Sequence, residues 1–279
     1  MLFKEVMESF FKFSSVHHSE GTKTYYRSRE KVLLKHFGNM RPEDITSDHI
    51  LDFIVAQRNR NPDISNSTIN KMVAALKFII KNQCNIEIQF RKLTEIEKVI
   101  PVVPKHIVRL VFRHYETSEK TPQNQRNYLM FRLLLDTGLR INELINLKVE
   151  NIDFDTNTIH ARVTKTKRER YTFFTSEAHL ILTKYIIANH IKEYLFIDFR
   201  TKEKLKVDHV ETICYRLKNK LNITVPISPH RWRHTFATNF LKKSRDIEVL
   251  RLILGHRNLS TTQKYLHLDK EYLHEIYFK

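Results

Sequence analysis

Residues 228–265 read SPHRWRHTFATNFLKKSRDIEVLRLILGHRNLSTTQKY and predict a helix that presents charged side chains on its first turn. A cap residue followed by proline, Ser228-Pro229, is a strong helix start. His230 and Arg233 then lie on the turn whose free N–H groups and positive dipole end attract phosphate. Arg233 also falls within the apolar arc of this helix, where an arginine is uncommon unless it is paired or faces a cleft.

The second half of this stretch ends one helix at a glycine and begins another before a tyrosine. Gly255 follows the apolar run IEVLRLIL, and a left-handed glycine there would end the helix. A plain helix stop would explain the glycine, but the turn also fixes where His256 emerges. The STTQ segment at 260–263 has the form of a capping box. Tyr265, nine residues after His256, is expected just inside the helix that this box starts.

A second motif, TGLRINEL at 137–144, supplies another arginine. Gly138 follows the apolar helix FRLLLDT, so a sharp turn positions Arg140. Arg140 is expected on an apolar helix face, with Glu143 near enough to orient its guanidinium. A structural Arg–Glu pair would explain this segment alone. Two inward-facing arginines in one domain instead favour an anion cleft, because the planar fork of arginine can bind two phosphate oxygens at once.

Composition points to a polyanionic partner. The chain has 48 Lys and Arg against 31 Asp and Glu, a formal net charge of +17. A basic surface kept for solubility is the simpler interpretation, and nucleic-acid binding is the favoured one. Two cysteines, Cys84 and Cys214, suit a reducing cytoplasm without a disulfide framework. The scattered histidines lack zinc spacing, the N-terminus lacks a signal-peptide core, and no apolar run approaches membrane-spanning length.

Hydrophobic periodicity divides the chain into two domains and predicts a mainly α fold with a small β-sheet. Residues 1–95 show four helical patterns, the last with Ser67 as its cap. Two prolines interrupt helical continuity in the 96–104 linker. Within residues 105–279, polar and apolar side chains alternate at 157–163 and at 168–175, and this alternation predicts a β-hairpin. The other segments of this domain predict helices near 105–116, 123–136, 141–148, 177–190, 206–221, 229–243, 246–254 and 261–268.

The motifs TGLR-x-x-E-L, H-x-x-R and L-G-H, followed by a tyrosine nine residues after that histidine, resemble those of the tyrosine recombinase family. This family includes phage-type integrases and Xer recombinases. Each motif is a weak signal alone, whereas their joint occurrence in family order over about 100–279 is specific. The resemblance implies a catalytic domain at 105–279 and a helical core-binding, SAM-like DNA-binding domain at 1–95, which clamp opposite sides of the duplex.

The resemblance also implies roles for single residues. Arg140 and Arg233 would bind the phosphate, and Tyr265 would be the nucleophile. His230 and His256 would handle protons or contact the phosphate. With Lys165 as general acid, the implied catalytic set is Arg140, Lys165, His230, Arg233, His256 and Tyr265. Glu143 joins it in support of Arg140 because of the spacing described above.

The general acid is the least determined of these residues. The family places a lysine in the first β-hairpin, within a glycine-lysine-glycine pattern. Thr164 and Thr166 stand here where the glycines are usual, which leaves the choice between Lys165 and Lys167 open. We favour Lys165.

The chemistry implied by the resemblance needs no metal and no cofactor. Tyr265 would attack the scissile phosphate in line and leave a 3′-phosphotyrosyl link and a free 5′-hydroxyl. A phenol with a pKa of about 10 needs nearby positive charge and a base to react at neutral pH. The arginines would stabilise charge on the phosphate oxygens, and the lysine would protonate the departing oxygen. Because the phosphotyrosine conserves the ester, a 5′-hydroxyl of another strand can reverse the step.

We therefore expect a cytoplasmic, site-specific recombinase for double-stranded DNA with an inverted-repeat core site. Integration, excision, inversion and dimer resolution stay open, and a mobile element is one expected setting. The resemblance implies a homotetramer on paired sites, or a hetero-oligomer with a related recombinase. The alternatives are a type IB-like topoisomerase and a non-catalytic basic DNA-binding protein. The tail at 269–279 would pack on a neighbouring protomer or on its own core. It carries two rival nucleophiles, Tyr272 and Tyr277, which lack the spacing from His256.

Overall fold

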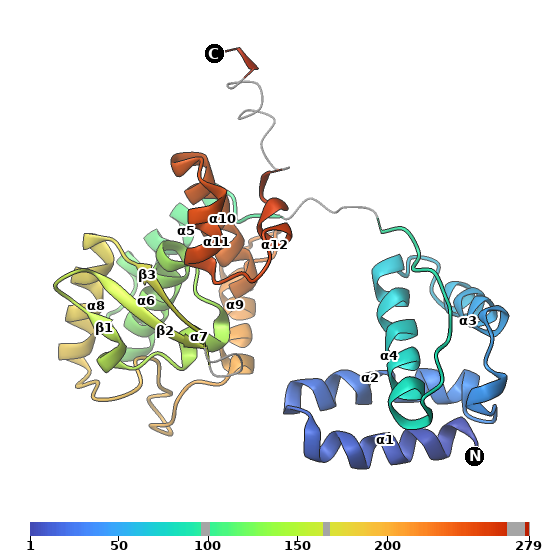
Figure 1. Cartoon of the computed structure of the whole chain (residues 1–279). Coiled ribbons are helices and arrows are strands. Elements are labelled where there is room, and N and C mark those ends of the chain that lie inside the picture. The colour runs from blue at the N-terminus through green and yellow to red at the C-terminus, as the bar shows by residue number, and fades with distance from the viewer. Residues whose placement is uncertain (96–100, 164–167, 267–276, 279) are drawn as a thin grey trace. The chain divides into compact units, whose positions relative to one another are not determined.

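The computed structural model describes residues 1–95, 101–163, 168–266 and 277–278. The chain divides into two compact units, Met1–Glu97 and Lys98–Lys279, and each is described by itself (Figure 1). Within the described residues, no helix is long and apolar enough to cross a membrane.

The described part of the first unit is helical, as predicted. Its elements are α1 (Phe3–His17), α2 (Glu20–Phe37), the 3₁₀ helix η1 (Pro42–Asp44), α3 (Ser47–Arg60) and α4 (Asn66–Cys84). Phe3, Phe10, Phe37 and Phe53 are fully buried between the helices, and each such burial stabilises the fold by roughly 1.5–3 kcal/mol.

The start of α4 differs from the prediction. Ser65 is the N-cap, and its hydroxyl accepts a hydrogen bond from the backbone N–H of Thr68 at 3.2 Å. The predicted cap at Ser67 is wrong because Ser67 already lies in the first turn, and the residue with extended backbone before the helix is Ser65.

The second unit combines helices with one small sheet, which confirms the predicted mainly α fold. Strand order is β1-β2-β3, and both neighbouring pairs are antiparallel. The predicted hairpin is present, whereas the two-residue β1 was not predicted because it is too short to show alternation. The elements are α5 (Lys105–Thr117), α6 (Pro122–Thr137), α7 (Ile141–Ile145), η2 (Val149–Asn151), β1 (Ile152–Asp153), β2 (Thr158–Val163), β3 (Arg168–Phe173), α8 (Ser176–Ala188), α9 (Val207–Lys220), α10 (Pro229–Ser244), α11 (Ile247–Leu254) and α12 (Ser260–Gln263).

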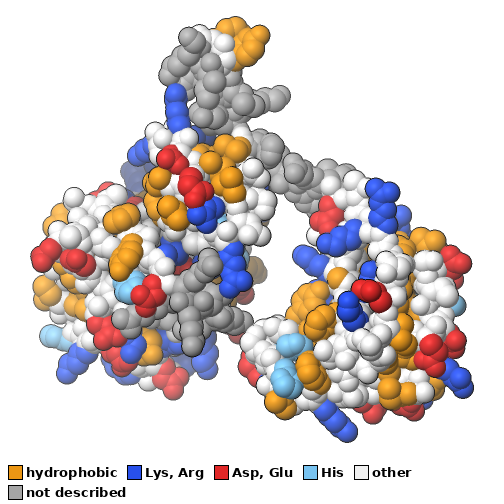
Figure 2. Space-filling model, in the orientation of Figure 1, with side chains coloured by type: hydrophobic (Ala, Val, Ile, Leu, Met, Phe, Trp, Pro, Cys, Tyr) orange, Lys and Arg blue, Asp and Glu red, His pale blue; other side chains and the backbone are white. Residues whose placement is uncertain are grey.

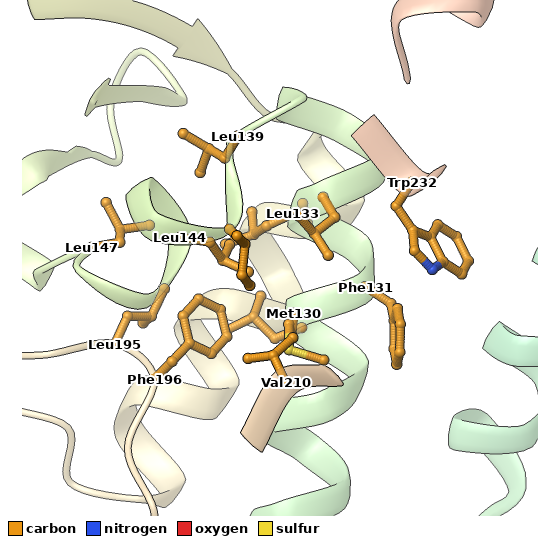
Figure 3. Packing of buried hydrophobic residues seen from close by; sticks show 14 of the residues in the cluster. Met130, Phe131, Leu133, Leu139, Leu144, Leu147, Leu195, Phe196, Val210 and Trp232 are labelled. Carbon is orange, nitrogen blue, oxygen red and sulfur yellow. The ribbon is translucent and has the colours of Figure 1, made fainter. Parts of the chain in front are cut away.

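The main core of this unit surrounds α6. Figure 3 shows Met130, Phe131 and Leu133 of α6 among buried side chains from the neighbouring elements. Trp232 of α10 is fully buried beside them, and its indole N–H donates to the carbonyl oxygen of Ile227 at 3.1 Å. This packing fixes the first turn of α10, which carries the predicted site residues, against α6.

A smaller core holds α11 against α10. Its buried residues are Phe236, Ala237, Leu241, Leu250, Ile253, Leu254 and Tyr265. Gly138 ends α6 against this core with a positive φ of 59°, and a Cβ there would lie 2.3 Å from Cδ1 of Phe236. Both the backbone conformation and the space therefore require glycine at the turn before Arg140.

The predicted capping box at 260–263 is wrong. Leu259 is the N-cap of α12, and its carbonyl oxygen accepts from the N–H of Gln263 at 2.9 Å. The hydroxyl of Thr262 is hydrogen-bonded to His256. Tyr265 consequently lies in the turn after the short α12 and not inside a helix. The predicted helix over 261–268 runs into residues 267–276, which lie outside the described part.

Candidate active site

Arg233 lies in the interior of the second unit, near the start of α10. Its side chain is only 5% exposed, and its guanidinium donates to the carbonyl oxygens of Gly138 and, at 2.8 Å, Leu254. These oxygens lie where α6 and α11 end, so one arginine links three helices. Burial lowers the pKa of Arg233 to about 9, with Arg140 and Arg170 adding to the shift. The group stays protonated at neutral pH.

Arg140 is the N-cap residue of α7 and stands at the edge of the site. Its Nη1 donates to Oε1 of Glu143 at 2.8 Å and its Nη2 to the oxygen of Gly255 at 3.1 Å. The other carboxylate oxygen of Glu143 accepts from the backbone N–H of Arg140 at 2.7 Å. The Arg140 side chain is 36% exposed, because the residue precedes the helix and does not lie on the apolar face that the pattern predicted.

A third arginine, Arg170 of β3, is buried beside the same carboxylate. Its Nη2 donates to Oε2 of Glu143 at 2.6 Å, and its Nη1 donates to the carbonyl oxygen of Ile253. Burial raises the pKa of Glu143, but Arg170 and Arg140 outweigh it, so the pKa is lowered overall. Glu143 is therefore ionised and shared between two cations.

The turn after α11 brings these groups together. Gly255 has the predicted left-handed conformation, with a φ of 63°. A Cβ at this position would lie 2.6 Å from Cδ of Arg170 and 3.6 Å from Nη1 of Arg140. The glycine thus permits the close approach of both arginines as well as the stop of the helix.

Both ring nitrogens of His256 have partners. Its Nε2 lies 3.1 Å from Nη2 of Arg233, and its Nδ1 lies 2.9 Å from the hydroxyl oxygen of Thr262. Because arginine only donates, Nε2 accepts, and Nδ1–H donates to Thr262. Burial, followed by Arg233 and Arg140, lowers the pKa of His256 to about 3, so the ring is neutral at pH 7.

Tyr265 is 2% exposed, and its hydroxyl oxygen lies 2.8 Å from Nδ1 of His234, which is 31 residues earlier in the chain. The ammonium of Lys264 lies 5.3 Å from the centre of the Tyr265 ring. Burial raises the pKa of Tyr265, while Arg233 and Arg140 act in the opposite direction. The phenol therefore lies within electrostatic reach of both arginines, and one cluster holds the predicted anion-binding groups and the tyrosine.

The remaining predicted residues stand at or beyond the edge of this cluster. His230 is exposed on the first turn of α10, one helical turn before His234. Lys165 and Lys167 lie outside the described residues, so the choice between them stays a prediction.

The structure adds two residues that were not predicted, Arg170 and His234. Arg170 has the same strand parity as the buried Thr172, so alternation in β3 could have identified an inward arginine. His234 follows His230 by four residues in HRWRH and shares its helix face. Its contact with Tyr265 spans two helices and a turn, which no local pattern reveals.

The shared carboxylate yields a stability prediction. Glu143→Gln keeps the shape of the side chain but leaves Arg140 and Arg170 without a counter-charge. We expect the free energy of unfolding in urea to fall by about 3 kcal/mol, near the low end for breaking a buried ion pair, because Arg140 is partly exposed. Glu248→Gln is the matched control, since it removes the same charge from an exposed pair with Arg251. Equal losses in the two variants would contradict the structural role of Glu143.

The two neutral histidines predict that stability falls at acidic pH. Burial, with Lys264 next, lowers the pKa of His234 to about 4, and that of His256 is about 3. An unfolded histidine titrates at about pH 6.5, so the unfolded chain binds more protons below that value. The contribution of these two histidines to the free energy of unfolding is therefore fully present above about pH 6.5 and is lost as the pH falls toward 4.

Urea unfolding at about pH 7.5, 6 and 5, at constant ionic strength, measures this dependence. The double variant His234→Asn with His256→Asn should show a shallower decline over the same range. Identical urea midpoints for the unsubstituted protein at the three pH values would contradict the conclusion that folding lowers the pKa of these two histidines.

Comparison with known proteins identifies relatives over most of the chain. The family model described as "Phage integrase family" matches residues 109–272. The chain is 33% identical to the tyrosine recombinase XerA of Saccharolobus solfataricus over 247 residues, and this stretch covers 87% of this chain and 81% of the relative. It is also 33% identical to the tyrosine recombinase XerC of Bacillus pumilus over 232 residues, and this stretch covers 77% of this chain and 74% of the relative.

Solved structures show the same fold. The integrase of the transposon Tn1549, in complex with transposon right end DNA, has a TM-score of 0.78 at 18% identity over 95% of this chain and 94% of that chain. The XerH site-specific recombinase, bound to a palindromic difH substrate, has a TM-score of 0.74 at 18% identity over 98% of this chain and 83% of that chain.

Proposed function

Because the chain belongs to the phage integrase family of tyrosine recombinases, we propose that it cuts and rejoins DNA at specific sites with Tyr265 as its nucleophile. The observation that carries the proposal is the cluster itself. Two arginines held by backbone and carboxylate oxygens lie within electrostatic reach of one buried phenol. Binding alone would not require a tyrosine at this position.

The arginines keep hydrogen-bond capacity for a phosphate. A guanidinium has five N–H donors. Arg140 uses one on Glu143 and one on Gly255, so three remain, and its partial exposure leaves them accessible. Arg233 is positioned by its two carbonyl partners and by His256. We propose that these two groups bind the non-bridging oxygens of the scissile phosphate and stabilise the charge that grows on them during attack.

The burial of Tyr265 means that the described conformation precedes attack. With 2% of its surface exposed, the phenol can meet a phosphate only if the groups that cover it move away when DNA binds. The cleavage itself would form a bond between the Tyr265 oxygen and phosphorus and break the bond to the 5′ oxygen. Lys165 is the proposed donor of the proton to that oxygen, with Lys167 as its rival.

The names of the relatives support a proposal for the partner and the assembly. One solved relative is described as XerH bound to a palindromic difH substrate, and another as a lambda integrase dimer bound to a COC′ core site. We propose that this chain acts in the cytoplasm on double-stranded DNA with an inverted-repeat core, as a homotetramer on two paired sites or with a related recombinase. Residues 1–95 would supply the second DNA-binding surface.

A nicked suicide substrate tests the reaction. Footprinting on genomic DNA beside the gene defines the protected sequence, and a duplex of that sequence with a nick near the cleavage site traps the protein on DNA. We expect an adduct that survives denaturation in SDS. Relaxation of a plasmid without strand exchange would indicate a topoisomerase instead. Footprinting without any adduct would indicate a DNA-binding protein that does not cleave.

The charge of the chain predicts a strong dependence of DNA affinity on salt. Lys and Arg side chains occur on the visible face of each unit, among acidic and hydrophobic ones (Figure 2). If about six or more of them neutralise phosphates, raising the salt from about 50 to 200 mM should weaken binding at least about 10³-fold, because counterions are released. Fluorescence anisotropy with a labelled duplex measures the slope. Affinity that hardly varies with salt would contradict an interface made by phosphate contacts.

A further inference from the structure

Among the described residues, His234 is the histidine that is hydrogen-bonded to the hydroxyl of Tyr265, the oxygen proposed to react. Its Nδ1 lies 2.8 Å from the hydroxyl oxygen of Tyr265, and its ring packs against the tyrosine ring with centroids 5.7 Å apart. His256, by contrast, uses both ring nitrogens on Arg233 and Thr262. No nitrogen of His256 is left to accept a proton from the phenol.

The direction of the His234–Tyr265 hydrogen bond follows from charge. Burial keeps the phenol protonated by raising its pKa, so its O–H needs an acceptor. Burial also lowers the pKa of His234 to about 4, and Lys264, His230, Arg233 and Arg231 add to this shift. A neutral imidazole has one nitrogen with a free lone pair. With Nδ1 as that nitrogen, the phenol donates and His234 accepts.

We infer that His234 is the catalytic base of the proposed reaction, the group that takes the proton of Tyr265 as the phenolic oxygen attacks the phosphate. In that step the O–H bond of Tyr265 breaks and its proton moves to Nδ1, while the bond between oxygen and phosphorus forms. The bond to the 5′ oxygen breaks, and the general acid of the proposed function protonates that oxygen. During rejoining, His234 returns the proton to the departing phenolic oxygen. The inference rests on the proposed function and adds the residue that activates its nucleophile.

The surroundings of His234 make it a stronger base when DNA is bound. In the described conformation its positive neighbours, from α10 and the turn after α12, disfavour the imidazolium. A phosphate held by Arg140 and Arg233 would offset part of this positive charge. The pKa of His234 should therefore rise toward its ordinary value in the complex, where a base is needed.

A substrate with sulfur in place of the scissile 5′ oxygen isolates this step. A thiolate leaves without a proton, so cleavage of this duplex depends on activation of the nucleophile and not on the general acid. We expect His234→Ala to lower the single-turnover cleavage rate about 10²- to 10⁴-fold on both the oxygen and the sulfur duplex. Lys165→Ala, or Lys167→Ala if that residue is the acid, should lose activity on the oxygen duplex and regain it on the sulfur duplex.

His234→Asn separates a base from a residue that only positions the tyrosine. Asparagine can accept the hydrogen bond of the phenol but cannot take its proton at neutral pH. We expect this variant to be as slow as His234→Ala and to lack the rise in rate with pH that the unsubstituted protein shows while His234 loses its proton. His209→Ala, an exposed histidine of α9, is the control for loss of a histidine. Thermal melts verify that every variant is folded.

Three results would overturn the inference while leaving the proposed function intact. The first is near-normal cleavage of the sulfur duplex by His234→Ala, and the second is a near-normal cleavage rate for His234→Asn. The third is that His230→Ala shows the loss of cleavage expected here for His234→Ala, while His234→Ala itself cleaves normally. If the unsubstituted protein forms no adduct with the suicide substrate, the proposed function fails and the inference fails with it.

Discussion

Tyr265→Phe is expected to abolish the covalent protein–DNA adduct, a loss of more than about 10⁴-fold, while DNA affinity changes by less than about two-fold. Phenylalanine fills the same buried space and removes only the hydroxyl that would attack the phosphate. The adduct is measured with the nicked suicide substrate in SDS gels, and affinity by anisotropy with an intact duplex. The substitution also breaks one hydrogen bond, to His234, which should lower stability by only about 1 kcal/mol.

The other tyrosines near the C-terminus provide matched controls for this prediction. Tyr272→Phe and Tyr277→Phe remove hydroxyls at positions that do not fit the spacing from His256, and both should form the adduct normally. An adduct that persists in Tyr265→Phe and disappears in one of these two variants would identify a tyrosine of the tail as the nucleophile.

Arg233→Lys is expected to give the next largest effect, a fall of about 10³-fold in single-turnover cleavage. Lysine keeps the positive charge but lacks the planar fork that reaches the carbonyl oxygens of Gly138 and Leu254. It therefore cannot hold both the turns and a phosphate oxygen at the same time. The measurement is the rate of adduct formation under conditions where all DNA is bound.

Arg216→Lys is the control for this substitution, because Arg216 is exposed on α9 and outside the cluster. It should cleave at the normal rate. A thermal melt of Arg233→Lys establishes that the variant is folded before its rate is interpreted. If the folded Arg233→Lys protein cleaves DNA at the rate of Arg216→Lys, the proposed role of Arg233 in binding the scissile phosphate is contradicted.

Much of the fold could be predicted because its signals are local. The start of α10 follows from Ser228-Pro229, and the end of α11 follows from an apolar run closed by Gly255. The hairpin follows from alternation in β2 and β3. In each case the residues that determine the backbone conformation lie within a few positions of the feature that they produce.

The parts that could not be predicted depend on contacts between distant segments. The carboxylate of Glu143 is shared with Arg170, which is 27 residues away in the chain, so the local Arg–Glu spacing identifies only one of its partners. The start of α12 was misassigned by one residue, because the carbonyl oxygen of Leu259, and not that of Ser260, accepts the first backbone hydrogen bonds of the helix. The bond of the Thr262 hydroxyl to His256 depends on the turn at Gly255, which lies before the helix and outside the capping pattern.

Mass spectrometry of the trapped adduct tests the central claim most directly. Trypsin cleaves after Lys264 and Lys270, so Tyr265 falls in the peptide YLHLDK, whereas Tyr272 and Tyr277 both fall in EYLHEIYFK. After nuclease treatment, the remaining phosphonucleotide should be attached to the tyrosine of YLHLDK. Attachment to EYLHEIYFK, or to any other residue, would contradict the account.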